Sequence, residues 1–233
     1  MRGRADIEFS KILYHGSLDI IVQPQLGKGK IYNDYGQGFY CTEHMELAKG
    51  WACDEKRSGY ANKYKLNMWG LCVLNLSDPQ YSILYWLTMI MTYRKIRVSA
   101  PVMKLGIDWL QAHYTIDLAP YDVIVGYRAD DSYFSFARSF VNNEISLEQL
   151  SYAMRLGKLG EQYVLKTQKA FDALEFLAYI PADYREYYIK RKQRDEQARK
   201  AYFTELEQYD MLNGIYIRDL IRGEVEVHDT RLR

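Results

Sequence analysis

The apolar residues of this chain occur in two kinds of segment, short continuous runs and longer stretches in which they recur every three or four positions. The short runs are bounded by turn residues, which is typical of buried β-strands. Between the first runs and the rest of the chain, Pro24, Gly27, Gly29 and Gly36 predict a mobile loop over residues 23–37. The strands predicted in this way span residues 10–15, 19–22, 69–76, 121–127 and 162–166.

Helical periodicity defines the longer stretches, and capping residues indicate where they begin. Thr42 is expected to cap a helix over 43–53, because its hydroxyl can accept a hydrogen bond from a free backbone N–H. Asp78 and Pro79 predict the start of a helix over 79–93, since proline is tolerated at the first helical position.

Three further helices are predicted before residue 181. One spans about 101–113. Ser146 and Gln149 form a capping-box pair for a second helix, which ends near Gly157. Thr167 is expected to cap a third helix, whose apolar face carries Ala170, Phe171, Leu174 and Leu177.

Beyond Pro181 the composition changes, because charges of both signs alternate with tyrosines at helical intervals. A long amphipathic helix over 183–207 is expected. It is either a solvated helix with an aromatic seam packed on the body of the protein, or a docking arm for a partner protein. The predicted organisation is one α+β domain over 1–180 with a helical insertion at about 79–113, and a charged, Tyr-rich helical extension over 181–233.

The composition permits one substantial hydrophobic core, because 48% of the 233 residues are hydrophobic. The formal net charge of +1 provides no global basic field of the kind that nucleic-acid binders usually carry, which argues against DNA as the resting partner. Tyrosine is abundant, with 22 residues, which either cover the core or form a binding face.

The cysteines and histidines do not have the spacing of a metal site. An odd number of cysteines, with no apolar signal core near the N-terminus, indicates a reducing compartment. No apolar run reaches the roughly 18 residues that a membrane span needs. We therefore expect a cytoplasmic protein without a metal. The residues concerned are Cys41, Cys53, Cys72, His44, His113 and His228.

Two segments near the N-terminus carry the strongest indication of chemistry. Leu13-Tyr14-His15-Gly16-Ser17 ends an apolar stretch with an imidazole and a glycine, whose missing Cβ lets a ligand approach the backbone closely. In the second segment, residues 35–42, Tyr40 follows Gly36 and Gly38, where its ring can stack on a flat heteroaromatic group.

These segments resemble the ADP-ribosyltransferase superfamily, in particular its poly(ADP-ribose) polymerase and diphtheria-toxin-like branch with a His-Tyr-Glu triad. In that branch the His lies in a His-Gly-Ser/Thr strand, the Tyr in a Gly-x-Tyr/Phe turn that opens a helix, and the Glu at the start of a late strand. The matching segments here are His15-Gly16-Ser17, Gly38-Phe39-Tyr40 and Glu161-Gln162-Tyr163-Val164-Leu165.

The resemblance covers residues 11–178 and extends to a bacterial domain family of unassigned function in the same superfamily. Members of that family are often encoded beside a small antitoxin. The resemblance implies that His15 bonds a ribose hydroxyl of NAD and that the Gly16 backbone pairs with the nicotinamide amide. Ser17 and Gly38 belong to the same two cofactor-binding motifs.

The resemblance also implies how the nicotinamide ring is held. Tyr40 would stack on the ring, and Trp51 would either complete the sandwich or serve as a core anchor. Ala48 occupies a position where the family often has a serine that bonds the nicotinamide amide. Losing that one neutral hydrogen bond weakens binding by about 1 kcal/mol.

Gln162 stands where the family has its catalytic glutamate. Glutamine keeps a hydrogen bond to the ribose but supplies no negative charge to the oxocarbenium-like transition state, a loss of about 2 to 4 kcal/mol. The outcomes are a slow mono-transferase, a site charged by Glu161, Asp130 or Asp131, or an NAD-binding domain without catalysis. Asp130 and Asp131 can also cap the next helix, which is the favoured interpretation. Because the two side chains are nearly the same size, Gln162→Glu is expected to fold normally and restore the charge.

The resemblance therefore implies an ADP-ribosyltransferase-like split β-sheet that clasps NAD as cosubstrate. The implied reaction transfers a single ADP-ribose to a macromolecular acceptor, and a small antitoxin protein is a further expected partner. Two alternatives are a non-catalytic NAD- or ADP-ribose-binding module that acts through a protein partner, and an NAD glycohydrolase.

Overall fold

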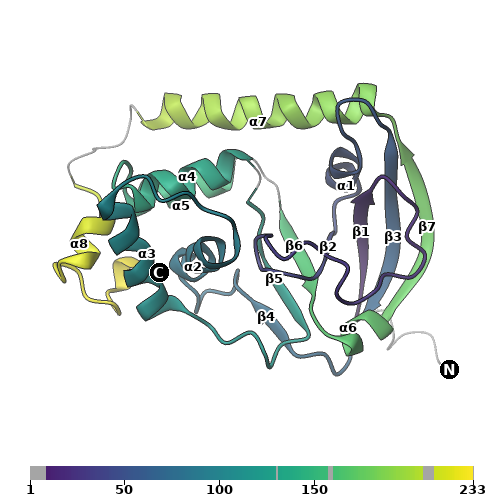
Figure 1. Cartoon of the computed structure of the whole chain (residues 1–233), viewed down its shortest axis with the longest axis horizontal. Helices are drawn as coiled ribbons and strands as arrows, with labels where there is room; N and C mark the ends of the chain where they lie inside the picture. The colour runs from purple at the N-terminus through teal and green to yellow at the C-terminus, as the bar shows by residue number, and fades with distance from the viewer. Residues whose placement is uncertain (1–8, 130, 157–159, 207–212, 233) are drawn as a thin grey trace.

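The described strands form one mixed sheet in the order β4-β5-β6-β2-β1-β3-β7 (Figure 1). The computed structural model describes residues 9–129, 131–156, 160–206 and 213–232. Only β4 and β5 pair in parallel, and the other neighbours are antiparallel. The strands are β1 (Ser10–Ser17), β2 (Phe39–Thr42), β3 (Gly59–Asn67), β4 (Val73–Asn75), β5 (Val123–Tyr127), β6 (Glu161–Leu165) and β7 (Leu174–Ala182).

A single residue pair joins the two parts of this sheet. β1 pairs with β3 along its whole length, but it pairs with β2 only through Tyr14 and Thr42. β2 continues instead along β6, where Tyr40 lies opposite Val164. The sheet is therefore divided between β1 and β2. The mixture of helices and a largely antiparallel sheet confirms the expected α+β class.

The helices cover the two parts of the sheet unequally. Most of them gather beside β4, β5 and β6, whereas α1 packs on β1, and the long α7 contacts α1, α4 and α5 (Figure 1). The helices are α1 (Met45–Ala52), α2 (Ile83–Tyr93), α3 (Pro101–Tyr114), α4 (Asp131–Val141), α5 (Leu147–Leu156), α6 (Gln168–Asp172), α7 (Tyr184–Leu206) and α8 (Ile217–Ile221).

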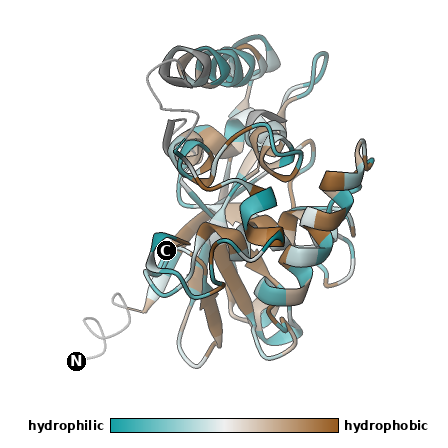
Figure 2. Ribbon diagram, turned by 90° about the vertical axis from the view of Figure 1, so that its left-hand side faces the viewer, coloured by the Kyte–Doolittle hydropathy of each residue, from teal (hydrophilic) through white to brown (hydrophobic). Residues whose placement is uncertain are grey.

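Two apolar clusters pack on opposite faces of the sheet. Ile124 and Val164 belong to the larger cluster with Trp86, while their strand neighbours Val125 and Tyr163 belong to the smaller one. Alternating side chains of a strand point to opposite faces, so β5 and β6 contribute to both clusters. Hydrophobic residues accordingly dominate the strands, whereas α7, seen end-on at the top, is mostly hydrophilic (Figure 2).

Several elements confirm the predictions from periodicity and capping. α3 and β5 lie where the pattern predicts them. The Ser146 backbone N–H donates to Gln149 Oε1 at 2.8 Å, and the Gln149 N–H donates to Ser146 Oγ at 3.3 Å, which is the expected capping box. The expected end of that helix at Gly157 lies outside the described residues. α7 buries Ala198 and Tyr202, so an aromatic seam packs on the body of the protein.

The helix expected from Asp78 and Pro79 begins only at Ile83. Asp78 instead accepts a hydrogen bond from Asn75 Nδ2 at 2.7 Å, and its carbonyl accepts from the N–H of Tyr81 in a turn. Ser82 is the cap, because its hydroxyl accepts from the N–H of Leu84 at 3.2 Å. The prediction was wrong because a side-chain contact across the turn competes with capping.

Thr42 does not cap α1. Its hydroxyl accepts from the N–H of His44 at 3.2 Å, two residues on, and the helix starts later, at Met45. No strand forms over 19–22, where the Ile21 N–H donates to Asn62 Oδ1 at 2.9 Å. In the predicted strand 69–76, only Val73–Asn75 pairs with a neighbour.

Thr167 caps α6 as predicted, since its hydroxyl accepts from the N–H of Ala170 at 3.3 Å, but the predicted length of this helix is the largest error. α6 ends at Asp172, and Leu174 and Leu177 lie in the strand β7. β7 pairs with β3, where Leu174 lies opposite Leu66 and Phe176 opposite Tyr64. These partners are about a hundred residues away along the chain, so tertiary pairing overrides a local pattern that suits either structure.

Candidate functional site

A cavity of about 620 Å³ lies where the sheet divides. β1 contributes His15 and Gly16 to its lining, and β2 contributes Phe39 and Tyr40. The β1–β2 loop, which we define as residues 18–38, forms one wall, and Trp51 of α1 lies on another. The cavity thus brings together the two N-terminal motifs and the tryptophan that sequence reasoning singled out.

His15 presents one nitrogen as an acceptor. Its Nδ1 lies 2.7 Å from the carbonyl oxygen of Tyr40, and since a carbonyl only accepts, Nδ1 carries the proton. Burial lowers the pKa of His15, although the bond to the Tyr40 carbonyl opposes this shift. The imidazole is therefore neutral near pH 7, and its Nε2 carries a lone pair. The ring also stacks on Phe39, with centroids 4.2 Å apart.

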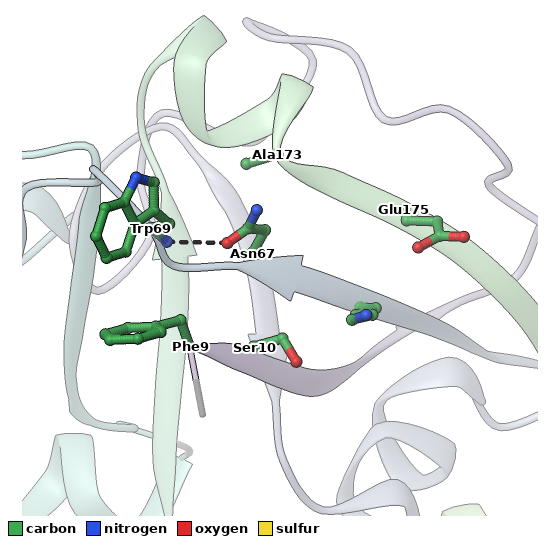
Figure 3. Close-up of a pocket in the computed structure, with 7 residues that line it drawn as sticks. Phe9, Ser10, Asn67, Trp69, Ala173 and Glu175 are labelled. Atoms are coloured by element: carbon green, nitrogen blue, oxygen red, sulfur yellow. Dashed lines mark hydrogen bonds between the residues drawn. The ribbon is translucent and has the colours of Figure 1, made fainter. Parts of the chain in front are cut away.

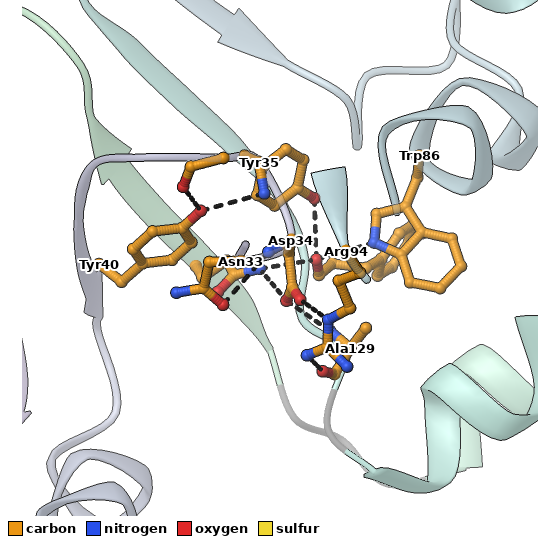
Figure 4. A network of polar contacts seen from close by, with 10 residues as sticks. Asn33, Asp34, Tyr35, Tyr40, Trp86, Arg94 and Ala129 are labelled. Carbon is orange, nitrogen blue, oxygen red and sulfur yellow. Dashed lines mark hydrogen bonds and ion pairs between the residues drawn. The ribbon is translucent and has the colours of Figure 1, made fainter. Parts of the chain in front are cut away.

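Tyr40 lies in β2, rather than in a turn that opens a helix. Its hydroxyl donates to the Gly36 carbonyl at 2.6 Å and accepts from the N–H of Tyr35 at 3.0 Å (Figure 4). Burial raises the pKa of Tyr40 far above its usual value, so the phenol stays protonated. The ring lines the cavity while its hydroxyl holds the end of the β1–β2 loop.

Positively charged side chains also line the cavity. The Arg128 guanidinium carbon lies 3.5 Å from the centroid of the Trp51 ring, a cation–π contact. Lys28 and Lys30 of the β1–β2 loop also line the cavity. Among the described lining residues none is acidic, so the cavity suits an aromatic ligand that carries negative charge.

Sequence reasoning did not select Arg128, Lys28 or Lys30. Arg128 follows the end of β5, and Trp51 lies near the end of α1. The two side chains meet only because the fold brings these two ends together. The two lysines lie among the loop glycines, where a basic residue is an available but weak local signal.

Gly16 is required by packing against α1. A Cβ on Gly16 would lie 2.0 Å from the Ala48 carbonyl oxygen and 2.8 Å from the Ala52 nitrogen. Ala48 is itself fully buried beneath this contact and does not line the cavity. The missing Cβ therefore serves a backbone approach within the protein, while Gly16 still borders the cavity.

Ser17 and Gly38 have different positions relative to the cavity. Ser17 does not line it, since its hydroxyl donates to the Asp19 carbonyl at 2.5 Å and accepts from Asn62 Nδ2 at 3.0 Å. Gly38 lines it, and a Cβ there would lie 2.6 Å from Val164 Cγ1. Ser17 thus fixes the start of the β1–β2 loop, and Gly38 lets its end pack on β6.

Gln162 shares a sheet face with Tyr40 but is buried away from the cavity. Its Nε2 donates to Asp34 Oδ2 at 2.8 Å and to the Tyr127 carbonyl at 3.2 Å. The side chain is 3% exposed and does not line the cavity. Since the Asp34 carboxylate only accepts, the amide nitrogen must face it. Asp34 of the β1–β2 loop therefore covers Gln162, the residue that the sequence resemblance aligned with a catalytic glutamate.

Asp34 is the buried carboxylate at the centre of this network, and sequence reasoning missed it. Arg94 Nε lies 2.6 Å from Asp34 Oδ1, and the Ala129 N–H donates to Oδ2 at 2.9 Å (Figure 4). The carboxylate is thus matched by one guanidinium and two hydrogen-bond donors. This arrangement changes the expectation for Gln162→Glu, because a glutamate would put a second carboxylate against Asp34.

Glu161 points to the opposite face of β6. Side chains alternate along a strand, and the next residue on the Glu161 face is Tyr163, whose hydroxyl donates to Glu43 Oε2 at 2.9 Å. Glu161 is half-buried and lies outside the cavity lining. Asp130 lies outside the described residues, as does the side chain of Asp131, although α4 begins at that position.

A second cavity, of about 570 Å³, lies at the other end of the β1 and β3 strands (Figure 3). It is bordered by Phe9 and by Trp69, which is 71% exposed and packs edge-on against Phe9. None of the motif residues borders it.

The described residues contain no group of three potential metal ligands. They also contain no helix with the length and apolar character of a membrane span.

Comparison with known proteins gives one match. A family model described as "Protein of unknown function (DUF3990)" matches residues 11–176 of the 233-residue chain. No curated protein and no solved structure matches this sequence or fold. The lining of the cavity at the divided sheet runs from His15 to Phe171, so it lies wholly within the matched range.

Proposed function

The chain belongs to the DUF3990 family, and we propose that it is a mono-ADP-ribosyltransferase that transfers ADP-ribose from NAD to a macromolecular acceptor. One observation carries this proposal: His15, Tyr40 and Trp51 border a single cavity at the division of the sheet. In this reading the fold is the split sheet of the ADP-ribosyltransferase superfamily, with NAD held between its two parts.

The cavity supports the proposal through the chemistry of its walls. NAD combines two aromatic rings with a diphosphate. Tyr40 and Trp51 offer faces for the nicotinamide ring. Arg128, Lys28 and Lys30 offer positive charge to the diphosphate. The neutral His15 accepts a hydrogen bond from a ribose hydroxyl through Nε2, which orients the sugar.

The proposed reaction is a displacement at the nicotinamide ribose. The bond between C1′ and the nicotinamide nitrogen breaks, and its electron pair leaves with nicotinamide. A nucleophilic atom of the acceptor forms the new bond to C1′ and releases its proton. The protein contributes orientation of the ribose and ring, since the described lining residues include no Ser, Thr, Cys, Asp or Glu side chain.

The position of Gln162 makes this reaction slow. The glutamate that stabilises the transition state in the resembling family is replaced by an amide that is buried against Asp34. Losing one preorganised electrostatic contact costs about 2 to 4 kcal/mol, or roughly 10² to 10³ in rate. Elongation into a polymer depends most on that carboxylate, so transfer of a single ADP-ribose is the proposed outcome.

The same observation favours a second candidate function. The amide nitrogen of Gln162 is engaged with Asp34 and the Tyr127 carbonyl, and no described carboxylate lines the cavity. The chain would then be a non-catalytic NAD- or ADP-ribose-binding module that acts through a protein partner.

Incubation of the purified protein with NAD tests both candidates. Released nicotinamide together with ADP-ribose label on a macromolecule supports the transferase. Release without any labelled acceptor indicates an NAD glycohydrolase instead. Binding of NAD without release, detected as a raised thermal midpoint, indicates the binding module. A protein that neither binds NAD nor releases nicotinamide refutes the whole assignment.

We also propose that the activity is harmful in a cytoplasm and is held in check by a small antitoxin protein. This proposal rests on the family resemblance alone. Expression in a bacterial host is expected to slow growth, and coexpression of the partner to relieve it. Normal growth with confirmed soluble expression would contradict it.

A further inference from the structure

The β1–β2 loop exposes an unusual number of large apolar side chains. Scattered single apolar residues are normal on a protein surface, but a concentration beside a cavity indicates a binding surface. Within a stretch of thirteen residues, the loop exposes Ile20 (38%), Val22 (60%), Leu26 (47%), Ile31 (55%) and Tyr32 (54%).

The loop is held in a defined shape by hydrogen bonds from the body of the protein and by others within the loop. The buried Asn62 accepts from the Ile21 N–H at 2.9 Å, and the Tyr64 hydroxyl donates to the Ile21 carbonyl. Gln37 Nε2 donates to the carbonyls of Gly27 and Gly29 at 2.7 and 3.0 Å. Since these bonds fix the backbone of the loop, its apolar side chains are exposed to solvent in defined positions.

The loop has two different sides. Ile21, Gln23 and Gln25 line the cavity, whereas their neighbours Val22 and Leu26 do not. One set of side chains therefore faces the proposed NAD site and the other faces outward. A molecule that rests on the outward set would lie beside the mouth of the cavity.

The charge of this surface is positive. Lys28 and Lys30 border the cavity but are also exposed to solvent. The acidic residues of the loop lie at its ends, where Asp19 is exposed and Asp34 is buried, so residues 20–33 contain none. The exposed Lys95, from the end of α2, places its Nζ 4.1 Å from the centroid of the Tyr32 ring. A partner that covers this surface is matched best when it combines apolar side chains with carboxylates.

We propose that the outward side of the β1–β2 loop, formed by Val22, Leu26, Ile31, Tyr32 and Lys95, is the docking surface for a protein acceptor with an acidic, apolar segment. The identification of the partner as the acceptor rests on the proposed function. A segment docked there brings its nucleophilic side chain next to the cavity in which ADP-ribose would be held. The exposed loop then selects the acceptor, while the cavity selects the donor.

Peptide selection tests the surface without relying on catalysis. The immobilised full-length protein is panned with a random 12-residue peptide library, and the enriched peptides are expected to combine Asp or Glu with large apolar residues. Their affinity for Val22→Ser/Leu26→Ser/Ile31→Ser is expected to fall about 10-fold or more, as for loss of interface anchors. Lys95→Glu is expected to weaken binding and reduce its salt dependence.

The matched control is Val98→Ser/Leu105→Ser/Ile189→Ser, which removes equally exposed apolar side chains outside the loop. It should bind the selected peptides like the wild type. Failure to enrich acidic, apolar peptides, or equal affinity for the wild type and the loop variant, would overturn the proposal. Loop-dependent binding to vesicles of phosphatidylglycerol and phosphatidylcholine, or to single-stranded RNA, in place of the peptides would also overturn it.

Activity measurements separate this proposal from the proposed function. With NAD alone, the loop variant should release nicotinamide at the wild-type rate, because none of its three residues lines the cavity. With a protein fused to a selected peptide, label transfer should fall about 10-fold in the loop variant and stay unchanged in the control. If the wild-type protein releases no nicotinamide, the proposed function fails, and the peptide affinities still decide whether the surface docks a protein.

Discussion

Replacing Gln162 with glutamate tests whether the buried network or the family pattern decides what this position tolerates. In the network, Gln162 Nε2 donates to Asp34 Oδ2 at 2.8 Å. A glutamate would remove that donor and place two carboxylates in contact. Two unit charges about 3 Å apart repel by about 5 to 6 kcal/mol at an effective dielectric constant of about 20. Arg94 is already engaged with the other oxygen of Asp34, at 2.6 Å.

Protonation limits this cost. One carboxyl of the pair can keep its proton and donate to the other, which raises the pKa of the pair in the folded state. Holding a carboxyl protonated costs about 1 kcal/mol at pH 5 and about 5 kcal/mol at pH 8. A group whose folded pKa is raised stabilises the fold at low pH and loses that stabilisation as the pH rises. Gln162→Glu should therefore destabilise the protein by about 3 to 5 kcal/mol at pH 8 and by about 1 kcal/mol at pH 5.

Urea unfolding at pH 5, 6, 7 and 8 measures this difference as a shift of the midpoint relative to the wild type. Glu161→Gln is the matched control, because Glu161 lies on the opposite face of β6 and should show no such pH dependence. In the double variant Asp34→Asn/Gln162→Glu, an amide again meets a carboxylate, and part of the lost stability should return. A Gln162→Glu protein that is as stable as the wild type at pH 8, with faster nicotinamide release, would refute this reasoning.

Three further predictions concern the cavity. Tyr40→Phe should cost about 1 to 3 kcal/mol of stability, because the Tyr35 N–H loses its acceptor. Tyr40→Ala should also abolish most of the NAD-induced rise in thermal midpoint. An unchanged rise in the Tyr40→Ala protein would exclude Tyr40 from the site. Trp51→Ala should weaken NAD binding about 5- to 30-fold, through loss of the ring and of its cation–π contact with Arg128. Calorimetric titration measures this affinity. Equal affinity of the wild type and the variant would make Trp51 a packing residue only. Because burial lowers the pKa of His15, its contribution to stability should persist above pH 6.5 and decline as the pH falls through the lowered value. NAD affinity should decline in the same pH range. If His15→Asn leaves the pH profile of NAD affinity unchanged, the titration belongs to another group.

The sequence by itself determined the features that depend on neighbouring residues. The capping box of Ser146 and Gln149 forms as predicted, because both partners lie within one helical turn. The β1 motif and the glycines around Phe39 and Tyr40 marked two walls of the cavity, since a run of apolar residues beside a glycine is a local pattern. The buried centre of β5 was predicted for the same reason.

The tertiary structure alone decided what depends on distant partners. Leu174 and Leu177 suit a helix or a strand, and pairing of β7 with β3 selected the strand. Asp34 and Gln162 lie 128 positions apart, so no local pattern could relate them. Arg128 reaches Trp51 only because the ends of β5 and α1 meet at the divided sheet. A pattern of a few residues fixes local hydrogen bonds, whereas the burial and charge of the site arise from contacts that only the folded chain creates.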